Sequence, residues 1–377
     1  MKRQTHLYTD EQTFWHCTGV QASHMQVGGW VEPPAGSYGA DTPGSKRRLL
    51  NLVRASHFDD CILVTSSPAA SREALLRVHP AGYIDEFKRV SDAGGGELGP
   101  YAPFSKGGFE IASVSAGLAI AAVDSVLSGQ CKNSYALCRP AGHHCLADQP
   151  MGFCLLANIP IAIEAGKAIH GLKRVAVIDW DVHHGNGTQS IFYDRSDVLT
   201  ISLHQEHCFP PGYSGLKDRG IDAGEGFNLN IPLPAGSGDE TYLYAMDEIV
   251  VPAVRKFKPD LIVVACGLDA CAFDPLGRQL LHSDSYRSMT ARVSELADEL
   301  CDGRLVVVHE GGYSEAYAPF CGMAVLEVLA NATSGVVDGE LELIKALQPS
   351  EPIRRFHKTM IQDMRNMFDF SLLSAEP

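Results

Sequence analysis

The sequence predicts an α/β fold in which a parallel β-sheet is flanked by helices, and long loops form a site at the carboxyl ends of the strands. Three observations support this class: short apolar runs without polar alternation, helix-length segments between them, and long stretches rich in Gly and Pro. No shift in composition and no internal repeat marks a boundary. We therefore expect a single domain over residues 1–377, with a peripheral helix after about residue 350.

Apolar runs that are nearly continuous are typical of strands buried on both faces of a parallel sheet. The runs are 61–65, 135–139, 174–180, 198–204, 261–267 and 304–310. The helix-length segments that lie between them include 108–129, 158–170, 239–257 and 283–301. The last begins at Ser283 with Asp284 in its first turn, as an N-terminal cap would. Strands that alternate with helices predict βαβ units.

The stretches richest in Gly and Pro are too long or too rich in breakers to form helices or strands, and are expected to be loops. They are 28–44, 94–108, 210–226 and 234–238. Loops of this kind usually form the ligand crevice of an α/β protein. The loop 28–44 could also serve as the interface of a homo-oligomer.

Composition and charge exclude several classes of function. The formal net charge of -14 argues against binding to nucleic acid, which requires clustered Lys and Arg, and is compatible with a cationic substrate. The eleven cysteines form no CxxC pair, and Cys154, Cys266 and Cys301 lie in apolar runs, which favours buried thiols in a reducing compartment. With no signal peptide and no apolar stretch of membrane-spanning length, we expect a soluble cytoplasmic protein without membrane contact.

Polar residues follow several of the predicted strands, at the sheet edge where open parallel sheets bind ligands. In the segment DWDVHH, Asp179, Asp181 and His183 alternate by two and would project from one side of the chain. Alone, such residues could equally cap a strand end. However, Asp269 follows the apolar run 261–268, and a buried carboxylate there needs a partner. Asp181, His183 and Asp269 then supply the three protein ligands of a catalytic zinc site.

Two adjacent histidines, His143 and His144, follow the apolar run 135–139. Imidazole titrates near neutrality, so this pair is a candidate general acid and base beside a metal. Each ring needs an orienting partner, and Asp179 and Asn186 are suitable by residue type. Tyr313 follows two glycines after the run 304–310, which would let its phenol reach the metal as an oxyanion donor.

Together these segments resemble the zinc-dependent histone deacetylase superfamily, specifically its class II members and the bacterial histone deacetylase-like amidohydrolases. The shared motifs, in family order between residues 139 and 316, are RPAGHHC, MGFCLLAN, DWDVHHGNGTQ, LTISLH, GLDA with DPLGR, and HEGGYS. The resemblance implies one deacetylase-like catalytic domain with the arginase/deacetylase fold and a parallel sheet of about eight strands. It also implies a zinc-dependent hydrolase that removes acetyl or other acyl groups from acylated primary amines, such as acetyl-lysine in a peptide.

Carried over by motif, the family's chemistry assigns Asp181, His183 and Asp269 to one zinc ion. Zinc and His144 would activate water to attack the amide carbonyl, and His143 would add electrostatic support. Zinc and Tyr313 would share the developing oxyanion.

The resemblance also assigns a substrate tunnel and monovalent cation sites. Phe153 and Phe209 would wall the tunnel, with Leu276 at its rim and the carbonyl of Gly152 exposed to the acyl-lysine stem. A structural potassium ion would lie near the zinc, and a second monovalent site further away. The residues implied are Asp179, Ser202 and the backbone of Asp181, His183 and Leu203 for potassium, and Phe192, Val198 and Phe227 for the second site.

The sequence departs from the family pattern at three positions. Ala141 stands where the family usually has Pro, which loosens the loop before the histidines. Asn186 stands behind His144, as in class II proteins, and a neutral partner should raise the imidazole pKa less than an Asp would. The acidic residue that clamps the substrate backbone in many members has no clear equivalent in DAGGGELGPYAP, where Glu97 is the candidate.

Three other functions compete with deacylation of an amine. A binuclear manganese ureohydrolase of the same fold needs further carboxylates, but Gly185 and Cys271 stand two positions after His183 and Asp269. A non-catalytic relative that only binds acylated ligands is disfavoured because the ligands, the histidine pair and Tyr313 are all present. An acetylpolyamine amidohydrolase, or an esterase or other amidase that uses the same zinc, shares all of these residues and stays open.

Overall fold

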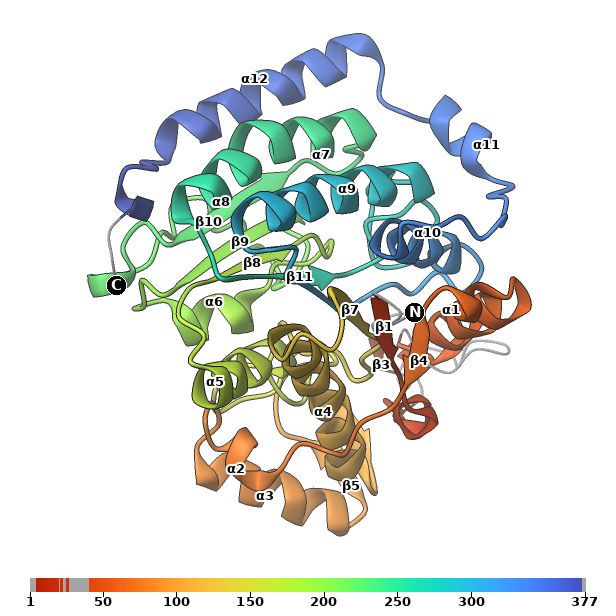
Figure 1. Cartoon of the computed structure of the whole chain (residues 1–377), viewed down its shortest axis with the longest axis vertical. Helices are drawn as coiled ribbons and strands as arrows, with labels where there is room; N and C mark the ends of the chain where they lie inside the picture. Colours follow the sequence, from red (N-terminus) through yellow and green to blue (C-terminus); the bar gives the residue numbers. More distant parts are fainter. Residues whose placement is uncertain (1–4, 20, 23–24, 27–40, 375–377) are drawn as a thin grey trace.

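A sheet of eight parallel strands forms the centre of the computed structural model, which describes residues 5–19, 21–22, 25–26 and 41–374 (Figure 1). The order of its strands is β10-β9-β8-β11-β12-β7-β1-β4. Their bounds are β1 Thr5–Tyr8, β4 Leu63–Thr65, β7 Asn133–Ala136, β8 Val175–Asp179, β9 Val198–Gln205, β10 Asn228–Leu233, β11 Leu261–Cys266 and β12 Leu305–His309. The predicted α/β class with about eight parallel strands is confirmed.

All six predicted strand segments overlap a strand, although β7 begins at Asn133, two residues before its predicted segment, and β1 and β10 were not predicted. Strand β10 lies at one edge of the sheet and contains Asn228, Asn230 and Pro232, which interrupt the apolar pattern. An edge strand tolerates Pro, which has no N–H to donate, because one side of the strand has no partner that needs a hydrogen bond. The prediction that 94–108 is only a loop was wrong, because β5 Gly95–Glu97 and β6 Pro103–Ser105 pair there in antiparallel fashion.

Helices cover both faces of the sheet (Figure 1). One face carries α1 Gly44–Ala55, α7 Asp239–Ala245, α8 Val251–Phe257, α9 Ser283–Leu300 and α10 Ala318–Ala330, with α11 Leu341–Ala346 and α12 Glu351–Met367 outside them. The other face carries α4 Gly108–Leu127, α5 Asn158–His170 and α6 Asn186–Phe192, with α2 Arg72–Leu75 and α3 Ala81–Asp92 beyond. Short elements complete the described chain: η1 Glu11–Trp15, β2 Gln21–Ala22, β3 Met25–Gln26, η2 Phe58–Asp60, η3 Asp222–Gly224 and η5 Leu372–Ser374.

The four predicted helices are present, with two differences in detail. The helix expected over 239–257 contains a π turn, η4 Met246–Val250, between α7 and α8. Pro252 in the first turn of α8 cannot donate a backbone hydrogen bond, which favours such a shift of register. The cap of α9 is His282, not Ser283: its side chain accepts from Ser285 N, and the Ser285 side chain bonds back to the His282 backbone.

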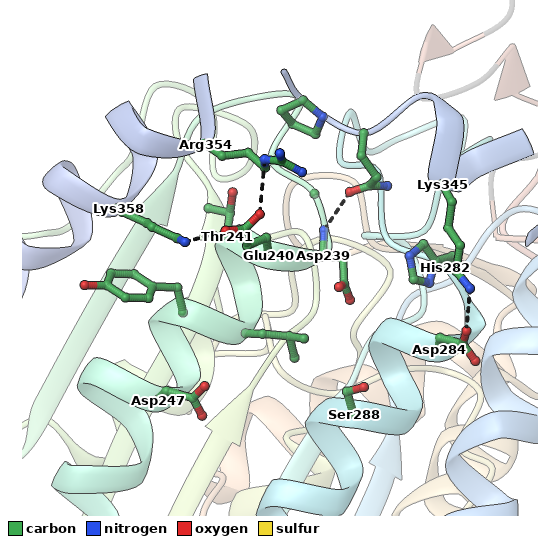
Figure 2. A pocket seen from close by; sticks show the side chains of 15 residues that line it. Asp239, Glu240, Thr241, Asp247, His282, Asp284, Ser288, Lys345, Arg354 and Lys358 are labelled. Carbon is green, nitrogen blue, oxygen red and sulfur yellow. Dashed lines mark hydrogen bonds and ion pairs between the residues drawn. The ribbon is translucent and has the colours of Figure 1, made fainter. Parts of the chain in front are cut away.

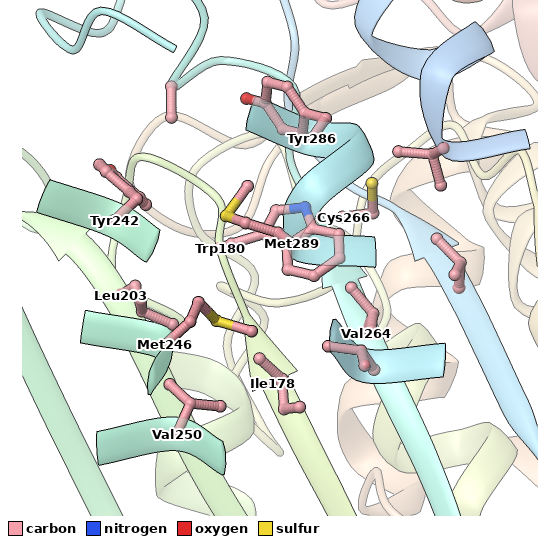
Figure 3. Close-up of a cluster of buried hydrophobic side chains, with 14 of the residues drawn as sticks. Ile178, Trp180, Leu203, Tyr242, Met246, Val250, Val264, Cys266, Tyr286 and Met289 are labelled. Carbon is pink, nitrogen blue, oxygen red and sulfur yellow. The ribbon is translucent and has the colours of Figure 1, made fainter. Parts of the chain in front are cut away.

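The core follows from the alternation of side chains along the central strands. Ile178 of β8 and Val264 of β11 are paired in register and point to the face covered by Met246, Val250 and Met289 (Figure 3). The intervening residues of the same strands point to the opposite face and pack with α4 and α5. Each buried side chain of this size contributes about 1.5–3 kcal/mol relative to an exposed one. The central strands are therefore held from both sides.

Helix α4 is long and apolar enough to cross a membrane by length and composition, contrary to the expectation from the sequence. Its most apolar window has a mean hydropathy of 1.6, and 72% of that window is buried inside the protein. The helix packs against α5 and the sheet, where residues such as Leu118 and Ala122 are fully buried. Its composition is that of a core helix.

The peripheral helix expected after residue 350 is α12, which lies at the edge of the molecule (Figure 1). A cavity of about 560 Å³ separates part of α12 from α7 and α9 (Figure 2). Charged side chains around it pair with one another: Lys345 lies 3.0 Å from Asp284, Arg354 lies 3.1 Å from Glu240, and Lys358 also pairs with Glu240. These ion pairs attach the C-terminal segment to the domain.

The order in which successive strands are added to the sheet reverses between the neighbouring parallel strands β8 and β11. From β8 the chain continues outward through β9 to β10, and then returns to β11 on the other side of β8. The loops after two such strands diverge and leave a crevice at their carboxyl ends, where open α/β sheets bind ligands. The predicted interface loop 28–44 falls almost wholly on residues 27–40, outside the described residues.

Candidate metal centre

The three predicted metal ligands meet at the junction of β8 and β11. Asp181 and His183 follow β8, and Asp269 follows β11. His183 Nδ1 lies 3.0 Å from Asp181 Oδ1 and 3.2 Å from Asp269 Oδ2, and all three side chains are buried. The structure thus brings together a donor set of two carboxylates and one imidazole that the sequence had only predicted to converge.

These residues fit a zinc ion by chemistry and by spacing. Ligands about 2.0–2.1 Å from a tetrahedral zinc ion lie about 3.3 Å from one another, close to the separations found here. Asp269 Oδ1 accepts a hydrogen bond from Val182 N at 2.9 Å, but the buried Oδ2 has no hydrogen-bond partner among the described residues. Burial and the nearby Asp181 raise the pKa of Asp269, which shows that its ionised form is disfavoured there. A cation between the two carboxylates would stabilise that ionised form.

The tandem histidines lie beside the metal ligands, each with an orienting partner. His143 Nδ1 lies 2.9 Å from Asp179 Oδ2, and His144 Nδ1 lies 2.8 Å from Asn186 Oδ1, the two partners suggested by residue type. Burial would lower the pKa of His143, but Asp181 and Asp179 raise it to about 10. Burial and then the neighbouring His143 hold the pKa of His144 well below its usual range. The two rings are therefore shifted in opposite directions, with positive charge favoured on His143 and disfavoured on His144.

The loop before the histidines is held by Glu310, a residue that the sequence analysis missed. Glu310 Oε2 accepts hydrogen bonds from Gly142 N at 2.7 Å and from His143 N at 3.0 Å. Asn158 Nδ2 donates to Pro140 O of the same loop at 3.0 Å. The position of Glu310 at the end of β12, directly before the two glycines, was the signal that could have identified it. Its carboxylate fixes the backbone that carries the histidine pair.

Tyr313 reaches the metal centre as predicted from the glycines before it. Gly311 N donates to Asp181 Oδ2 at 2.8 Å, and a Cβ on Gly311 would lie 2.0 Å from Asp269 Oδ2. Only glycine allows this approach. The Tyr313 ring makes an edge contact with His183 at 6.4 Å between centroids. Burial raises the pKa of Tyr313 well above its usual value, so its phenol remains a hydrogen-bond donor.

A cavity of about 350 Å³ leads to the centre. The tunnel residues predicted by resemblance, Gly152, Phe153, Phe209 and Leu276, all line it. A Cβ on Gly152 would lie 2.6 Å from His144 Cδ2, so the wall can approach that ring only as glycine. The remaining lining residues are His144, His183 and Tyr313 of the site, and Tyr101, Cys208 and Pro211, which were not predicted. In the part of the chain that is described, no Asp, Glu, Lys or Arg lines this cavity.

The candidate clamp Glu97 does not line the cavity. It is an exposed residue of β5, whereas Tyr101, on the following turn, reaches the cavity and makes an edge contact with Phe209 at 5.9 Å between ring centroids. The backbone of this turn supports the tunnel wall, because Phe153 N donates to Tyr101 O at 2.7 Å. The role of Glu97 as a clamp stays a prediction.

The residues predicted to hold potassium lie at the end of β8, in the segment that follows it, and within β9. Asp179 and Ser202 are register partners, and Asp179 Oδ1 accepts from Asp181 N at 3.0 Å. Ser202 Oγ lies 2.9 Å from His204 Nδ1. The residues of the second predicted site, Phe192, Val198 and Phe227, are buried in apolar clusters. Both cation sites stay predictions.

A buried ion cluster lies behind Tyr313. Asp41 Oδ1 is 3.2 Å from Lys46 Nζ, and its Oδ2 is 3.4 Å from Arg139 Nε. Lys46 Nζ in turn lies 5.5 Å from the centroid of the Tyr313 ring. Burial would raise the pKa of Asp41, but the charges of Arg139 and Lys46 lower it to about 2. The carboxylate therefore stabilises two buried cations next to the site.

Asp41→Asn should lower the free energy of unfolding by about 3–5 kcal/mol at pH 7, because two buried cations lose their partner. A carboxyl whose folded pKa is lowered stabilises the protein above its unfolded pKa, so the difference should shrink as the pH falls from about 4 towards 2. Urea unfolding at several pH values measures it. The control is Asp302→Asn, which breaks the exposed pair with Arg304 and should cost under about 1 kcal/mol. Equal losses in both variants would contradict the role of Asp41.

Comparison with known proteins gives consistent matches along the chain. The histone deacetylase domain family matches residues 41–329. The chain is 55% identical over 377 residues to a histone deacetylase-like amidohydrolase from Pseudomonas aeruginosa, covering 100% of this chain and 99% of that protein. It is 38% identical over 333 residues to histone deacetylase 8 from Arabidopsis thaliana, covering 85% and 87%. Among solved structures, the HDA15 HD domain matches with a TM-score of 0.80 at 27% identity and covers 97% of both chains.

Proposed function

The chain belongs to the histone deacetylase family, and from this we propose that it is a zinc-dependent amidohydrolase that removes acetyl or other acyl groups from primary amines such as acetyl-lysine. Membership supports an enzyme that hydrolyses amides. One observation carries the finer proposal: Asp181 and Asp269 converge with His183, and His183 itself lines a cavity together with His144 and Tyr313.

The residues of the site divide the work of amide hydrolysis. Asp181, His183 and Asp269 would hold the zinc ion, which would supply Lewis-acid polarisation of the carbonyl and lower the pKa of a water molecule. His144 is the general base: Asn186 occupies its Nδ1, which leaves Nε2 to take the proton from the attacking water. The water oxygen bonds to the carbonyl carbon, and the carbonyl oxygen gains negative charge.

Tyr313 donates its phenolic hydrogen to that oxygen, where charge develops only in the transition state. The C–N bond then breaks as the leaving nitrogen takes a proton from an imidazolium of the pair, which yields a carboxylic acid and a primary amine. His143 pairs with Asp179, and in its protonated form it adds positive potential next to the reacting atoms. No proton is gained or lost over the full cycle.

The lining of the cavity supports a substrate with an uncharged, extended segment next to the amide. Phe153, Phe209 and Leu276 offer apolar surface to an aliphatic stem such as that of acyl-lysine. An acetylpolyamine would place further amines outside the cavity, where the net charge of -14 would attract it. Acetyl-lysine is the leading substrate class because the stem fits the apolar wall.

The proposal includes three further features. A potassium ion near Asp179 and Ser202 would stabilise the loop that carries the zinc ligands, and their adjacent places in the sheet support this. A cytoplasmic, reducing location is supported by eleven free cysteines, most of them buried. A homo-oligomer without nucleic-acid or membrane partners agrees with the acidic composition.

A substrate screen with metal removal tests the function. We expect an acetyl-lysine peptide to be hydrolysed with a higher kcat/KM than acetylpolyamines or simple esters, with longer and fluorinated acyl-lysines measured beside it. Treatment with a chelator should lower this activity more than about tenfold, and added zinc should restore it. Turnover of esters alone would favour an esterase, and activity that survives complete metal removal would contradict the zinc mechanism.

A further inference from the structure

Two loops of the site meet at one carboxylate, that of Asp274. Its Oδ1 accepts hydrogen bonds from Leu276 N at 2.9 Å and Gly277 N at 3.3 Å. Its Oδ2 accepts from Tyr313 N at 2.8 Å and Ser314 N at 3.2 Å. Both oxygens are therefore used, and each serves a different loop.

The two loops have different tasks in the proposed reaction. The loop after β11 carries Leu276, which lines the cavity where the acyl chain enters. The loop after β12 carries Tyr313, the donor to the developing oxyanion. The bonds at Oδ1 form a local turn of the kind that Asp commonly makes. The bonds at Oδ2 cross to a segment 39 and 40 positions further along the chain, so they are not part of that turn.

The environment of Asp274 makes these bonds strong. The residue has only 7% exposure, and when its carboxyl is ionised a hydrogen bond to it is about twice as strong as one between neutral groups. Burial and then the charge of Asp269 raise the pKa of Asp274 to about 7, and the N–H groups of Leu276 and Tyr313 oppose that rise. The donors thus stabilise the carboxylate in a place that would otherwise disfavour it.

We propose that Asp274 is a positioning residue that couples the rim of the substrate cavity to the catalytic phenol, so that Leu276 and Tyr313 are placed as one unit. The proposal rests on the proposed function for its catalytic consequence. Asp274 does not line the cavity and acts through the backbone of Tyr313. A substrate whose acyl chain contacts Leu276 is thereby connected, through Asp274, to the phenol of Tyr313.

Asp274→Asn tests the coupling with almost no change in volume. The amide has one acceptor oxygen instead of two, and its NH₂ group would face two N–H donors, so one loop must lose its contacts in either orientation. We expect backbone hydrogen exchange to become at least about tenfold faster in peptides covering 274–279 and in those covering 311–316 together. This measurement requires no turnover, so it can be read even if the proposed function fails.

The matched control for exchange is Glu327→Gln. Glu327 is another carboxylate with 7% exposure that accepts a backbone hydrogen bond, from Ser334 N at 2.7 Å, but it lies on α10 away from the site. This variant should leave exchange in both loops unchanged. Faster exchange in only one of the two loops, or an equal effect of the control, would overturn the coupling.

A double-mutant cycle with Tyr313→Phe tests the catalytic part. In the wild-type background, Asp274→Asn should lower kcat by about 10- to 100-fold with bound zinc retained, because small misplacements of a reacting group have effects of this size. In the Tyr313→Phe background the same change should lower kcat by less than about threefold, because the group it positions is already lost. Equal losses in both backgrounds would reduce Asp274 to a structural residue. If Asp274→Asn does not fold, Asp274→Glu, which keeps both oxygens but displaces them, should give the same pattern in a milder form.

Discussion

Asp269→Ala should yield a folded protein that binds zinc at least about 100-fold more weakly and has no measurable hydrolase activity. The change removes one of three protein ligands, a larger loss than the 10- to 100-fold typical of removing a residue that only orients a ligand. Asp181 and His183 cannot hold the ion with the same geometry. Metal analysis of the purified protein, beside circular dichroism and a turnover assay, measures all three properties.

The matched control lies at the other end of the same strand. Asp260 precedes β11 and accepts a hydrogen bond from Arg174 N at 2.9 Å, whereas Asp269 follows β11 at the metal centre. Asp260→Ala should therefore keep the zinc and most of the activity while it removes a comparable backbone contact. Wild-type metal content in Asp269→Ala would refute the ligand assignment.

Tyr313→Phe should lower kcat by about 10²- to 10³-fold while zinc content and KM stay close to wild type. The phenyl ring keeps its edge contact with Phe153, at 6.0 Å between centroids, and its place 5.5 Å from Lys46 Nζ. Only the hydroxyl that donates to the oxyanion is removed. Steady-state kinetics on the best substrate from the screen, together with metal analysis, gives the result.

Tyr317→Phe is the control for the loss of a buried tyrosine hydroxyl. Tyr317 OH donates to Asp338 Oδ2 at 2.8 Å and does not line the substrate cavity. This variant should lose some stability but retain kcat. Full activity in Tyr313→Phe would show that another group stabilises the oxyanion.

The fold was largely predictable because its central strands are buried on both faces. Runs such as 261–267 carry no polar residue and admit few other interpretations. Strand β10 escaped prediction because Asn228 and Asn230 bond to Gln189 and to backbone of the loop before it, contacts that no local pattern reveals. Strand β1 is only four residues long and contains one Thr, one His and one Tyr beside a single Leu, which is too little apolar pattern to be recognised.

The site was predictable where its residues directly follow strands. Asp181, His183 and Asp269 could be assembled because parallel strands end at one edge. Glu310 and Asp274 could not, since their roles depend on hydrogen bonds between loops that are distant in sequence. The sequence likewise did not reveal Tyr101, because the pairing of β5 with β6 decides which residue of that turn reaches the cavity.

The junction of β8 and β11 has a consequence for how the chain acquires its metal. Val182 N bonds to Asp269 Oδ1 across 87 positions, and Asp179 pairs with Ala265 in the sheet. A slip of one residue between the two strands would turn the side chains that follow to the wrong face. With the proposed zinc site, we expect a newly synthesised chain to bind the ion only after both halves of the sheet have joined in the native register. Metal uptake would then be a late event in folding, and metal retention would report correctly folded protein.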